Sequence, residues 1–464
     1  MIFNSIDYIV FFSLFSLVFF LLKPKFRWIL LLTSSYFFYM CWKWEFIFLI
    51  IFSTVVDYFC GIKMSQKSIQ KQKRPYLLIS LFSNLGLLFF FKYFNFFLDS
   101  VSLVSDITYE PLNIILPMGI SFYTFQTMAY SIDAYKGKIQ PETHIGKFAL
   151  YVSFFPQLVA GPIERANKLL PQFQLNNNSF KFDNFIIGST QILFGLYKKV
   201  VLADLIAIYV ESIYGNYELY NGVTPLFATY LFAIQIYCDF SGYSDIAIGS
   251  ARILGYNLME NFRTPYFSKS ITEFWRRWHI SLSSWLRDYL YINLGGNRKG
   301  NIFTYRNLII TMLLGGLWHG ASWNFIIWGG LHGLFLALER IFNYSSKIAK
   351  KPIILRFISG LGSFHLVCFA WVFFRSETLA KSIGILTRIV DFQNFFNLKI
   401  KDINIFTSII FNILVFLTLE RVVKKLIVKK KINALETSFI HAVLILLIIL
   451  FGVNEGSQFI YFQF

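Results

Sequence analysis

The chain has 464 residues, of which 56% are hydrophobic and 56 are Phe, and its mean hydropathy is +0.55. A water-soluble protein of this composition would expose large apolar patches, so the composition excludes that class and predicts an integral membrane protein with many spans. The net charge of +18 does not indicate a nucleic-acid partner, because Lys and Arg lie between apolar runs and no RNA- or DNA-binding motif is present. We expect these basic residues to lie beside anionic membrane lipids.

The N-terminal apolar stretch is predicted to be a retained helix. The chain begins MIFNSIDYIVFF, with no basic residue before this stretch, and the first positive charges follow it at Lys23, Lys25 and Arg27. A secretory signal carries its positive charges first. The order found here therefore predicts a helix that stays in the membrane, with the N-terminus outside.

Apolar runs long enough to cross or enter a bilayer recur along the whole chain. The segment FFPQLVAGPIER (154–165) places Pro156, Gly161 and Pro162 beside one of them, which predicts a broken or re-entrant element. The runs cover residues 6–22, 28–41, 45–62, 76–98, 115–135, 148–160, 184–210, 224–248, 303–318, 323–342, 353–374, 404–420 and 438–452.

The charges between the runs predict how the chain crosses the membrane. Basic residues gather in alternate loops, at 61–74, 251–300, 343–352 and 421–431, which we place in the cytoplasm. The loops predicted outside, 99–114 and 211–222, contain acidic residues and no Lys or Arg. This alternation predicts about eleven or twelve spanning helices. No internal repeat or domain boundary is visible, so residues 1–464 are predicted to form one integral-membrane domain.

Two carboxylates lie inside a predicted span. The segment IYCDFSGYSDIAIGS (236–250) contains Asp239 and Asp245. A carboxylate at this depth needs a partner, such as an arginine or a backbone cap, and the pair could also serve ion coupling in a transporter.

Residues 262–300 are the segment richest in motifs and lie outside the predicted spans. They are predicted to be an amphipathic element on the cytoplasmic side. Ser270 followed by Glu273 is a capping box, so a helix is expected to begin near Ile271 and to end at Gly295–Gly296. The arginines fall mostly off its apolar stripe, as in helices that lie at a membrane surface. The stripe consists of Ile271, Trp275, Trp278, Leu282, Trp285 and Tyr289.

Three histidines are candidates for chemistry. His279 lies at the border of the stripe, and His319 follows an apolar run among Gly315, Gly316 and Gly320. Each could be structural, but an imidazole inside a membrane protein can also exchange a proton near neutral pH. On an unbroken helix His332, thirteen residues beyond His319, would point away from it.

His319 and His332 could therefore approach only if residues 320–322 break the helix, and we interpret His332 as structural. Four cysteines without a CxxC pair are interpreted as buried small hydrophobic residues. The histidines show no HxxxH or HExxH spacing, so no metal site is predicted.

Several segments together resemble a known family. ITEFWRRWHISLSSWLRDYLYINLGGNRKG (271–300) is followed by GGLWHGASWNFIIWGGLHG (315–333), with FFPQLVAGPIER and IYCDFSGYSDIA upstream. They resemble the membrane-bound O-acyltransferase family, and within it the bacterial alginate O-acetyltransferase membrane subunits and their peptidoglycan-acetylating relatives. The resemblance covers most of the chain, through FIYFQF at its end.

The resemblance implies a ring of tilted helices around a central tunnel that is open to both faces. It implies that His319 is the catalytic histidine, acting as general base, and that His279 is the second catalytic position. Because the two motifs match, the residues expected to line the tunnel or bind the donor are Trp275, Arg276, Arg277, Trp278, Trp318 and Asn324.

The implied reaction moves an acetyl group from a cytoplasmic thioester to hydroxyls of an exported polysaccharide, alginate-like or peptidoglycan. No cofactor is expected to stay bound, and the donor is acetyl-CoA or another acyl thioester. The implied partners are an extracytoplasmic esterase-like acetyltransferase and, if the donor is carried by a protein, an acyl-carrier protein. The location is the bacterial cytoplasmic membrane.

Three alternatives stay open. D-alanyl transfer to teichoic acid is the nearest, because that branch shares the RWH…SLS helix and the WHG element. A proton-coupled transporter would use Asp239 and Asp245 and perform no acyl chemistry. A scaffold that only docks a partner enzyme would not depend on His319.

Overall fold

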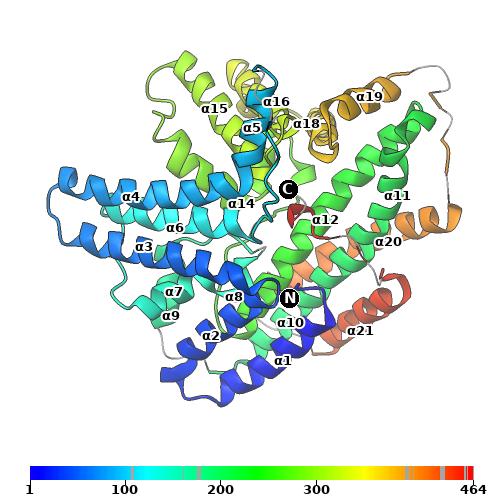
Figure 1. Cartoon of the computed structure of the whole chain (residues 1–464). Helices are drawn as coiled ribbons and strands as arrows, with labels where there is room; N and C mark the ends of the chain where they lie inside the picture. Colours follow the sequence, from blue (N-terminus) through cyan, green and yellow to red (C-terminus); the bar gives the residue numbers. More distant parts are fainter. Residues whose placement is uncertain are drawn as a thin grey trace. The chain divides into compact units, whose positions relative to one another are not determined.

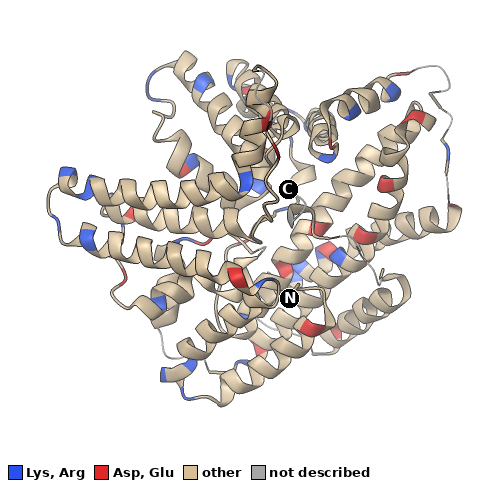
Figure 2. Cartoon of the chain, viewed as in Figure 1, with Lys and Arg blue, Asp and Glu red and all other residues tan. Residues whose placement is uncertain are grey.

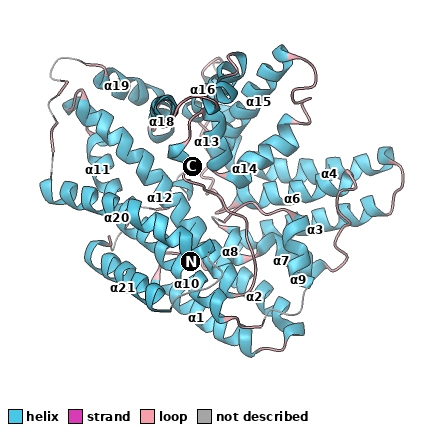
Figure 3. Cartoon of the chain, turned by 180° about the vertical axis from the view of Figure 1, so that it is seen from behind, coloured by secondary structure: helices cyan, strands magenta, loops and turns pink. Residues whose placement is uncertain are grey.

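The computed structural model describes residues 1–105, 109–159, 161–174, 179–391, 395–396, 398–400, 402–428, 434–453, 456 and 458–462. Throughout this part of the chain the regular elements are helices, as Figure 3 shows, so the predicted all-α fold is confirmed. The residues group into two compact units, Met1–Ile192 with Ile246–Met259, and Leu193–Asp245 with Glu260–Phe464. The single domain expected over residues 1–464 stays a prediction.

The first unit contains the N-terminal helices (Figure 1). They are α1 (Ile6–Leu21), α2 (Arg27–Met40), α3 (Ile47–Ser65), α4 (Gln70–Leu88), α5 (Phe94–Ser102), α6 (Ile120–Tyr135), α7 (Ile145–Ser153), α8 (Phe155–Leu158) and α9 (Ala166–Gln174). Short 3₁₀ turns η1 (Pro24–Phe26) and η2 (Trp44–Phe46) precede α2 and α3, and the π-helical η3 (Phe89–Tyr93) joins α4 to α5. Helices α10 (Phe182–Leu196) and α12 (Val223–Ile253) have residues in both units.

The second unit holds the motifs around the three histidines. Its helices are η4 (Tyr197–Ala203), α11 (Asp204–Gly215), η5 (Tyr217–Leu219), η6 (Pro265–Phe267), α13 (Ile271–Arg277), α14 (Ile280–Trp285), η7 (Leu286–Tyr291), α15 (Asn301–His319), α16 (Trp323–Ile341), α17 (Tyr344–Ala349), α18 (Ile353–Arg375), α19 (Leu379–Ile389), α20 (Ile403–Val428), α21 (Ala434–Phe451) and η8 (Ile460–Phe462).

The helices bear out the prediction of a polytopic membrane protein. Each of the thirteen predicted apolar runs coincides with one or more helices, and Figure 2 shows helices that are largely uncharged along their length. The number of crossings, predicted as eleven or twelve, stays a prediction. Among the described residues, five helical segments are long and apolar enough to span a membrane: Trp44–Ser65, Gln70–Ser102, Val223–Ile253, Ile353–Arg375 and Ile403–Ile427. Two further apolar helices, Ile6–Leu21 and Leu435–Phe451, are shorter.

In the first unit, a buried carboxylate joins α3, α4 and α6, which lie side by side (Figure 1). Asp57 on α3 is fully buried and accepts hydrogen bonds from Ser80, Asn84 and Ser131. The Oδ1 atom of Asn84 in turn accepts from Ser53 at 2.7 Å. A polar group inside an apolar bundle is costly unless it is hydrogen-bonded, so this network links three helices while it satisfies the carboxylate.

The predicted break near Pro156 is present. Helix α7 ends at Ser153 and the short α8 begins at Phe155, with Pro156 in its first turn. The Phe155 N–H, which the break frees, donates to Ser35 Oγ of α2 at 3.1 Å. The carbonyl of Tyr151 likewise accepts from Gln126 Nε2 at 2.6 Å. Side chains of neighbouring helices thus satisfy the backbone groups where the chain bends.

Candidate active site

Helices α15 and α16 form a hairpin that carries His319 and His332. Helix α15 ends at His319, Gly320 is extended, and Ser322 precedes α16, so the helix does break between His319 and His332. The two helices touch at glycines: a Cβ at Gly316 would lie 2.1 Å from the Phe325 carbonyl oxygen. Only residues without a side chain allow this approach. The hairpin turn therefore directs both histidines toward the same aromatic cluster.

His319 is surrounded by aromatic rings from four elements and is 3% exposed. Its ring centroid lies 4.9 Å from that of Trp328 on α16 and 5.4 Å from that of Phe374 on α18. Trp318 and Tyr461 lie at 5.1 and 5.3 Å. The rings exclude water from the imidazole, so the approach of any substrate requires one of them to move.

His279 lies at a break in the predicted amphipathic helix. We predicted one helix from Ile271 to Gly295, but that prediction is wrong, because α13 ends at Arg277 and α14 begins at Ile280. His279 has φ 41° and ψ 57°, in the left-handed region. A bulky residue in this region is strained, and such strain is found most often at functional sites.

Backbone hydrogen bonds hold the His279 turn in place. The Ile280 N–H donates to the Asn261 carbonyl at 2.9 Å, and the Ser281 N–H donates to Asn261 Oδ1 at 3.3 Å. The Arg263 N–H donates to the Arg277 carbonyl at 2.9 Å. These bonds on both sides of the turn offset the cost of the strained residue.

The two predicted catalytic histidines share the same neighbours. The His279 ring lies 5.9 Å from Trp318 and 6.3 Å from Tyr461, both of which also contact His319. His279 is fully buried, and this burial lowers its pKa to about 3. Its imidazole is therefore neutral at physiological pH.

His332 extends the cluster by one further imidazole. It is fully buried, and its Nδ1 accepts a hydrogen bond from Trp275 Nε1 at 3.3 Å. Because Nδ1 is the acceptor, the neutral ring carries its proton on Nε2. The Trp328 ring lies 4.9 Å from both His332 and His319. His332 thus supports the tryptophan that packs against His319.

A carboxylate of α16 caps the helix that carries Trp275. Glu339 accepts from the Ile271 N–H at 2.5 Å and from the Thr272 N–H at 2.9 Å. At the same end the Ser270 half of the predicted capping box is present, since Ser270 Oγ accepts from the Glu273 N–H at 3.1 Å, whereas Glu273 Oε2 accepts from the Lys269 N–H at 2.8 Å. The whole predicted apolar stripe is buried, including Trp278, which is fully enclosed. These contacts fix α13 against α16.

The two adjacent arginines have different surroundings. Arg277 forms an ion pair with Glu273, one helical turn before it. Arg276 is exposed and lines a cavity of about 380 Å³, which also contains the exposed Arg287. The other residues that line this cavity are Thr272, Trp275, Ile280, Ser283, Ser284, Leu286, Tyr291, Leu308, Thr311, Met312 and Leu336.

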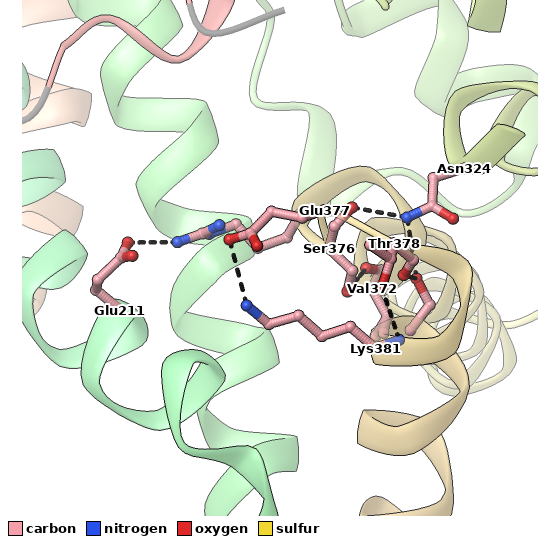
Figure 4. Close-up of polar contacts among 9 residues, drawn as sticks. Glu211, Asn324, Val372, Ser376, Glu377, Thr378 and Lys381 are labelled. Carbon is pink, nitrogen blue, oxygen red and sulfur yellow. Dashed lines mark hydrogen bonds and ion pairs between the residues drawn. The ribbon is translucent and has the colours of Figure 1, made fainter. Parts of the chain in front are cut away.

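Asn324, expected in the tunnel or donor site, lies in the first turn of α16. Its Nδ2 donates to the Ser376 carbonyl at 2.7 Å and to Ser382 Oγ at 3.3 Å, and Figure 4 shows the first of these bonds. Near it, Lys381 pairs with Glu377 at 3.3 Å. In this structure the Asn324 amide group therefore joins α16 to the start of α19.

The two intramembrane aspartates have cationic partners. Asp239 Oδ1 lies 2.8 Å from Lys199 Nζ, and Asp245 pairs with Lys198. Where an arginine or a backbone cap was predicted as the partner of the carboxylates, lysines of η4 supply the charge. The second oxygen of Asp239 accepts from the Ile460 N–H at 2.7 Å, so a backbone cap is present as well.

Sequence reasoning missed three of the rings around His319. Trp328, Phe374 and Tyr461 are ordinary aromatic residues in a chain with 92 of them, counting 56 Phe, 26 Tyr and 10 Trp. The one available signal was the FIYFQF stretch, which carries Tyr461 and was part of the family resemblance. Helical periodicity could not connect Tyr461 to His319 because 142 residues separate them in the chain.

Comparisons with known proteins show the family of the chain. Residues 142–373 match the model of the membrane-bound O-acyltransferase (MBOAT) family. The chain is 43% identical over 385 residues to a probable alginate O-acetylase AlgI of Pseudomonas syringae pv. tomato, covering 82% of this chain and 73% of that protein.

The chain belongs to the MBOAT family. It is a multi-pass membrane O-acyltransferase. It is also 37% identical to a peptidoglycan O-acetyltransferase of Helicobacter pylori, over 79% of this chain and 74% of that protein. A teichoic acid D-alanyltransferase of Bacillus subtilis is 29% identical over 58% of this chain and 71% of that protein.

Proposed function

We propose that this MBOAT protein transfers an acetyl group from a cytoplasmic thioester to hydroxyls of an exported polysaccharide of the alginate or peptidoglycan type. The observation that carries the proposal is that His279 and His319, forty residues apart, pack against the same two rings, Trp318 and Tyr461. The acetyl-transferring relatives at 43% and 37% identity support the choice of acyl group and acceptor.

His319 is the general base in this proposal. Its imidazole takes the proton of the acceptor hydroxyl while the oxygen attacks the thioester carbonyl, and the proton then passes to the departing thiolate. The aromatic rings that enclose His319 keep water away from the thioester, which limits hydrolysis.

His279 is the second catalytic residue. Because it is neutral, it donates one N–H, and we assign this donor to the oxyanion that forms during the attack. Its strained backbone fixes the ring direction before the substrate arrives, so no reorganisation is needed at the moment of reaction.

The cavity beside α13 is the proposed donor site. The guanidinium group of Arg276 supplies positive charge for an anionic donor such as acetyl-CoA or a carrier-bound phosphopantetheine, and Arg287, which is paired with Asp288 at 2.7 Å, adds further hydrogen-bond donors. Trp275, which lines the cavity, also donates to His332 in the aromatic cluster. One residue therefore belongs both to the cavity and to the catalytic cluster.

The proposed setting is the bacterial cytoplasmic membrane, with the N-terminus outside and the donor side in the cytoplasm. An extracytoplasmic esterase-like acetyltransferase is the proposed partner that completes delivery to the polysaccharide. The basic loops support the orientation, because loops rich in Lys and Arg stay in the cytoplasm.

Replacing His319 tests the proposal. In cells, His319→Ala should reduce the ester-linked acetate of surface polysaccharide by about 100-fold or more, the usual scale for loss of a general base. His365→Ala is the matched control, because His365 is exposed on α18. Normal acetylation by properly inserted His319→Ala protein would refute the assignment.

Measurement of the esters on cell-surface polymers also distinguishes acetyl transfer from D-alanyl transfer. D-alanyl transfer, favoured by the relative from Bacillus subtilis, predicts ester-linked D-alanine on teichoic acid and no change in ester-linked acetate. Base release of both esters from the polymers of wild-type and gene-deleted cells distinguishes the two reactions.

A further inference from the structure

A buried ion triad lies next to the catalytic cluster in the second unit. Lys199 Nζ on η4 is 2.8 Å from Asp204 Oδ1 of α11 and 2.8 Å from Asp239 Oδ1 of α12. The side chains of Lys199 and Asp204 are fully buried, and that of Asp239 is 3% exposed. Burying three charges costs more than their attraction usually returns, so the triad is weak evidence for a contribution to stability alone.

The triad has a second partner in the backbone of residues 458–462. Asp239 Oδ2 accepts from the Ile460 N–H at 2.7 Å. A carboxylate that accepts from a backbone N–H makes a strong, charge-assisted bond. Phe459, beside it, packs on Tyr243 with ring centroids 4.2 Å apart. Residues 458–462 are thus attached to α12 by a hydrogen bond and an aromatic contact.

This attachment places Tyr461 in the site. The Tyr461 ring lies 4.4 Å from Phe240, which follows Asp239 on α12 and itself lies 4.6 Å from the His279 ring. Tyr461 also contacts His319 at 5.3 Å. Loss of the bond at Ile460 would loosen Tyr461, a ring that contacts both imidazoles.

We propose that Asp239 is a positioning residue of the acyl-transfer site: paired with Lys199, it holds the Ile460 N–H and so fixes Tyr461 against His279 and His319. The effect of Asp239 on acyl transfer rests on the proposed function. The placement of residues 458–462 by Asp239 does not depend on the chemistry.

Two isosteric variants separate this role from general stability. Asp239→Asn and Asp204→Asn each remove one negative charge from the triad and leave Lys199 with one carboxylate. Only Asp239→Asn removes the charged acceptor of the Ile460 N–H. We expect Asp239→Asn to lower ester-linked acetate by about tenfold or more, the scale of a misplaced group. Asp204, whose Oδ2 lies against Gly456, keeps the Ile460 bond intact when it is changed to Asn, so Asp204→Asn should lower ester-linked acetate less.

A crosslink measures the segment directly. The double variant Tyr243→Cys, Phe459→Cys is treated in cells with membrane-permeant dibromobimane. In its background the four native cysteines are replaced by alanine: Cys41, Cys60, Cys238 and Cys368. Acetylation by this background is measured first, and immunoblots of membrane fractions confirm equal insertion. The crosslinking rate should fall more on addition of Asp239→Asn than of Asp204→Asn, and completed crosslinking should restore acetylation to the Asp239→Asn protein.

Two results would overturn the inference. One is an unchanged crosslinking rate in the Asp239→Asn protein, whatever its activity. The other is an Asp239→Asn protein that stays inactive after complete crosslinking, although the crosslinked protein that retains Asp239 is active. If His319→Ala instead keeps full acetylation, the proposed function fails, and the crosslinking rate still decides whether Asp239 holds residues 458–462.

Discussion

Contacts around single residues of the cluster fix the tautomer of His332 and the protonation state of His279. Trp275 donates to His332 Nδ1, which fixes the tautomer of that ring, and Trp328 lies between His332 and His319. His279 is set apart by its left-handed backbone and complete burial. A buried neutral imidazole affects both reactivity and stability, because charging it without a partner is costly.

The burial of His279 predicts a pH-dependent stability. Its pKa is lowered from 6.5 to about 3 in the folded protein, so the unfolded chain binds the proton more readily. The stabilisation is fully present above pH 6.5 and is lost as the pH falls toward 3. At pH 5 the loss is about 2 kcal/mol. Thermal unfolding of purified protein in detergent should show this decline, and His279→Asn should flatten it. An equally steep decline in the variant would contradict the prediction.

At the scale of elements, the α15–α16 hairpin depends on how closely its helices approach. A Cβ at Gly329 would lie 2.3 Å from the Met312 carbonyl oxygen, whereas one at Gly330 would lie 3.4 Å from Leu313 Cδ2. The backbone contact cannot yield without separating the helices, while the side-chain contact is ordinary packing. The hairpin also carries His319, His332 and the Glu339 cap of α13, so its geometry determines that of the site.

Adjacent glycines of α16 should therefore respond differently to alanine. Gly329→Ala is expected to destabilise the protein by about 1–3 kcal/mol through overpacking and to reduce acetylation. Gly330→Ala should be neutral or slightly stabilising, because alanine favours the helix. Unfolding temperatures of the two variants in the same detergent give the comparison. A stable, active Gly329→Ala protein would show that the helices can separate without loss.

At the scale of the whole molecule, charge sets the expected orientation in the membrane. The net charge of +18 is concentrated in loops such as 61–74 and 251–300, whereas loops 99–114 and 211–222 carry no Lys or Arg. Basic loops are retained in the cytoplasm. This orientation would place Arg276, Arg287 and their cavity on the side where thioester donors are made.

Cysteine labelling tests that orientation. In a cysteine-free background, Glu218→Cys should react in intact cells with a membrane-impermeant maleimide, and Lys67→Cys should react only after the cells are opened. The Glu218 side chain is exposed in the structure and that of Lys67 is partly exposed, so both positions are accessible within the protein itself. The reverse labelling pattern would place the proposed donor cavity on the wrong side of the membrane.

Local patterns in the sequence predict most of the helices and the faces that they bury. Hydrophobic runs, the capping box at Ser270 and the stripe from Ile271 to Tyr289 are local patterns, and the structure contains helices, a cap and a buried face where they predict them. Such patterns arise because helical hydrogen bonds and side-chain repetition involve residues only a few positions apart. The WHG and RRWHISLS motifs directed attention to His319 and His279 for the same local reason, through resemblance.

The contacts between distant residues follow from tertiary packing. The break at His279 interrupts an apolar stripe that continues undisturbed in the sequence, because bonds from Asn261 stabilise a turn that local preference would not choose. Tyr461 contacts His319 across 142 residues, and the N–H of the neighbouring Ile460 donates to Asp239, which is paired with Lys199 of another element. Contacts of this kind depend on the packing of distant elements, and no periodicity in the chain records them.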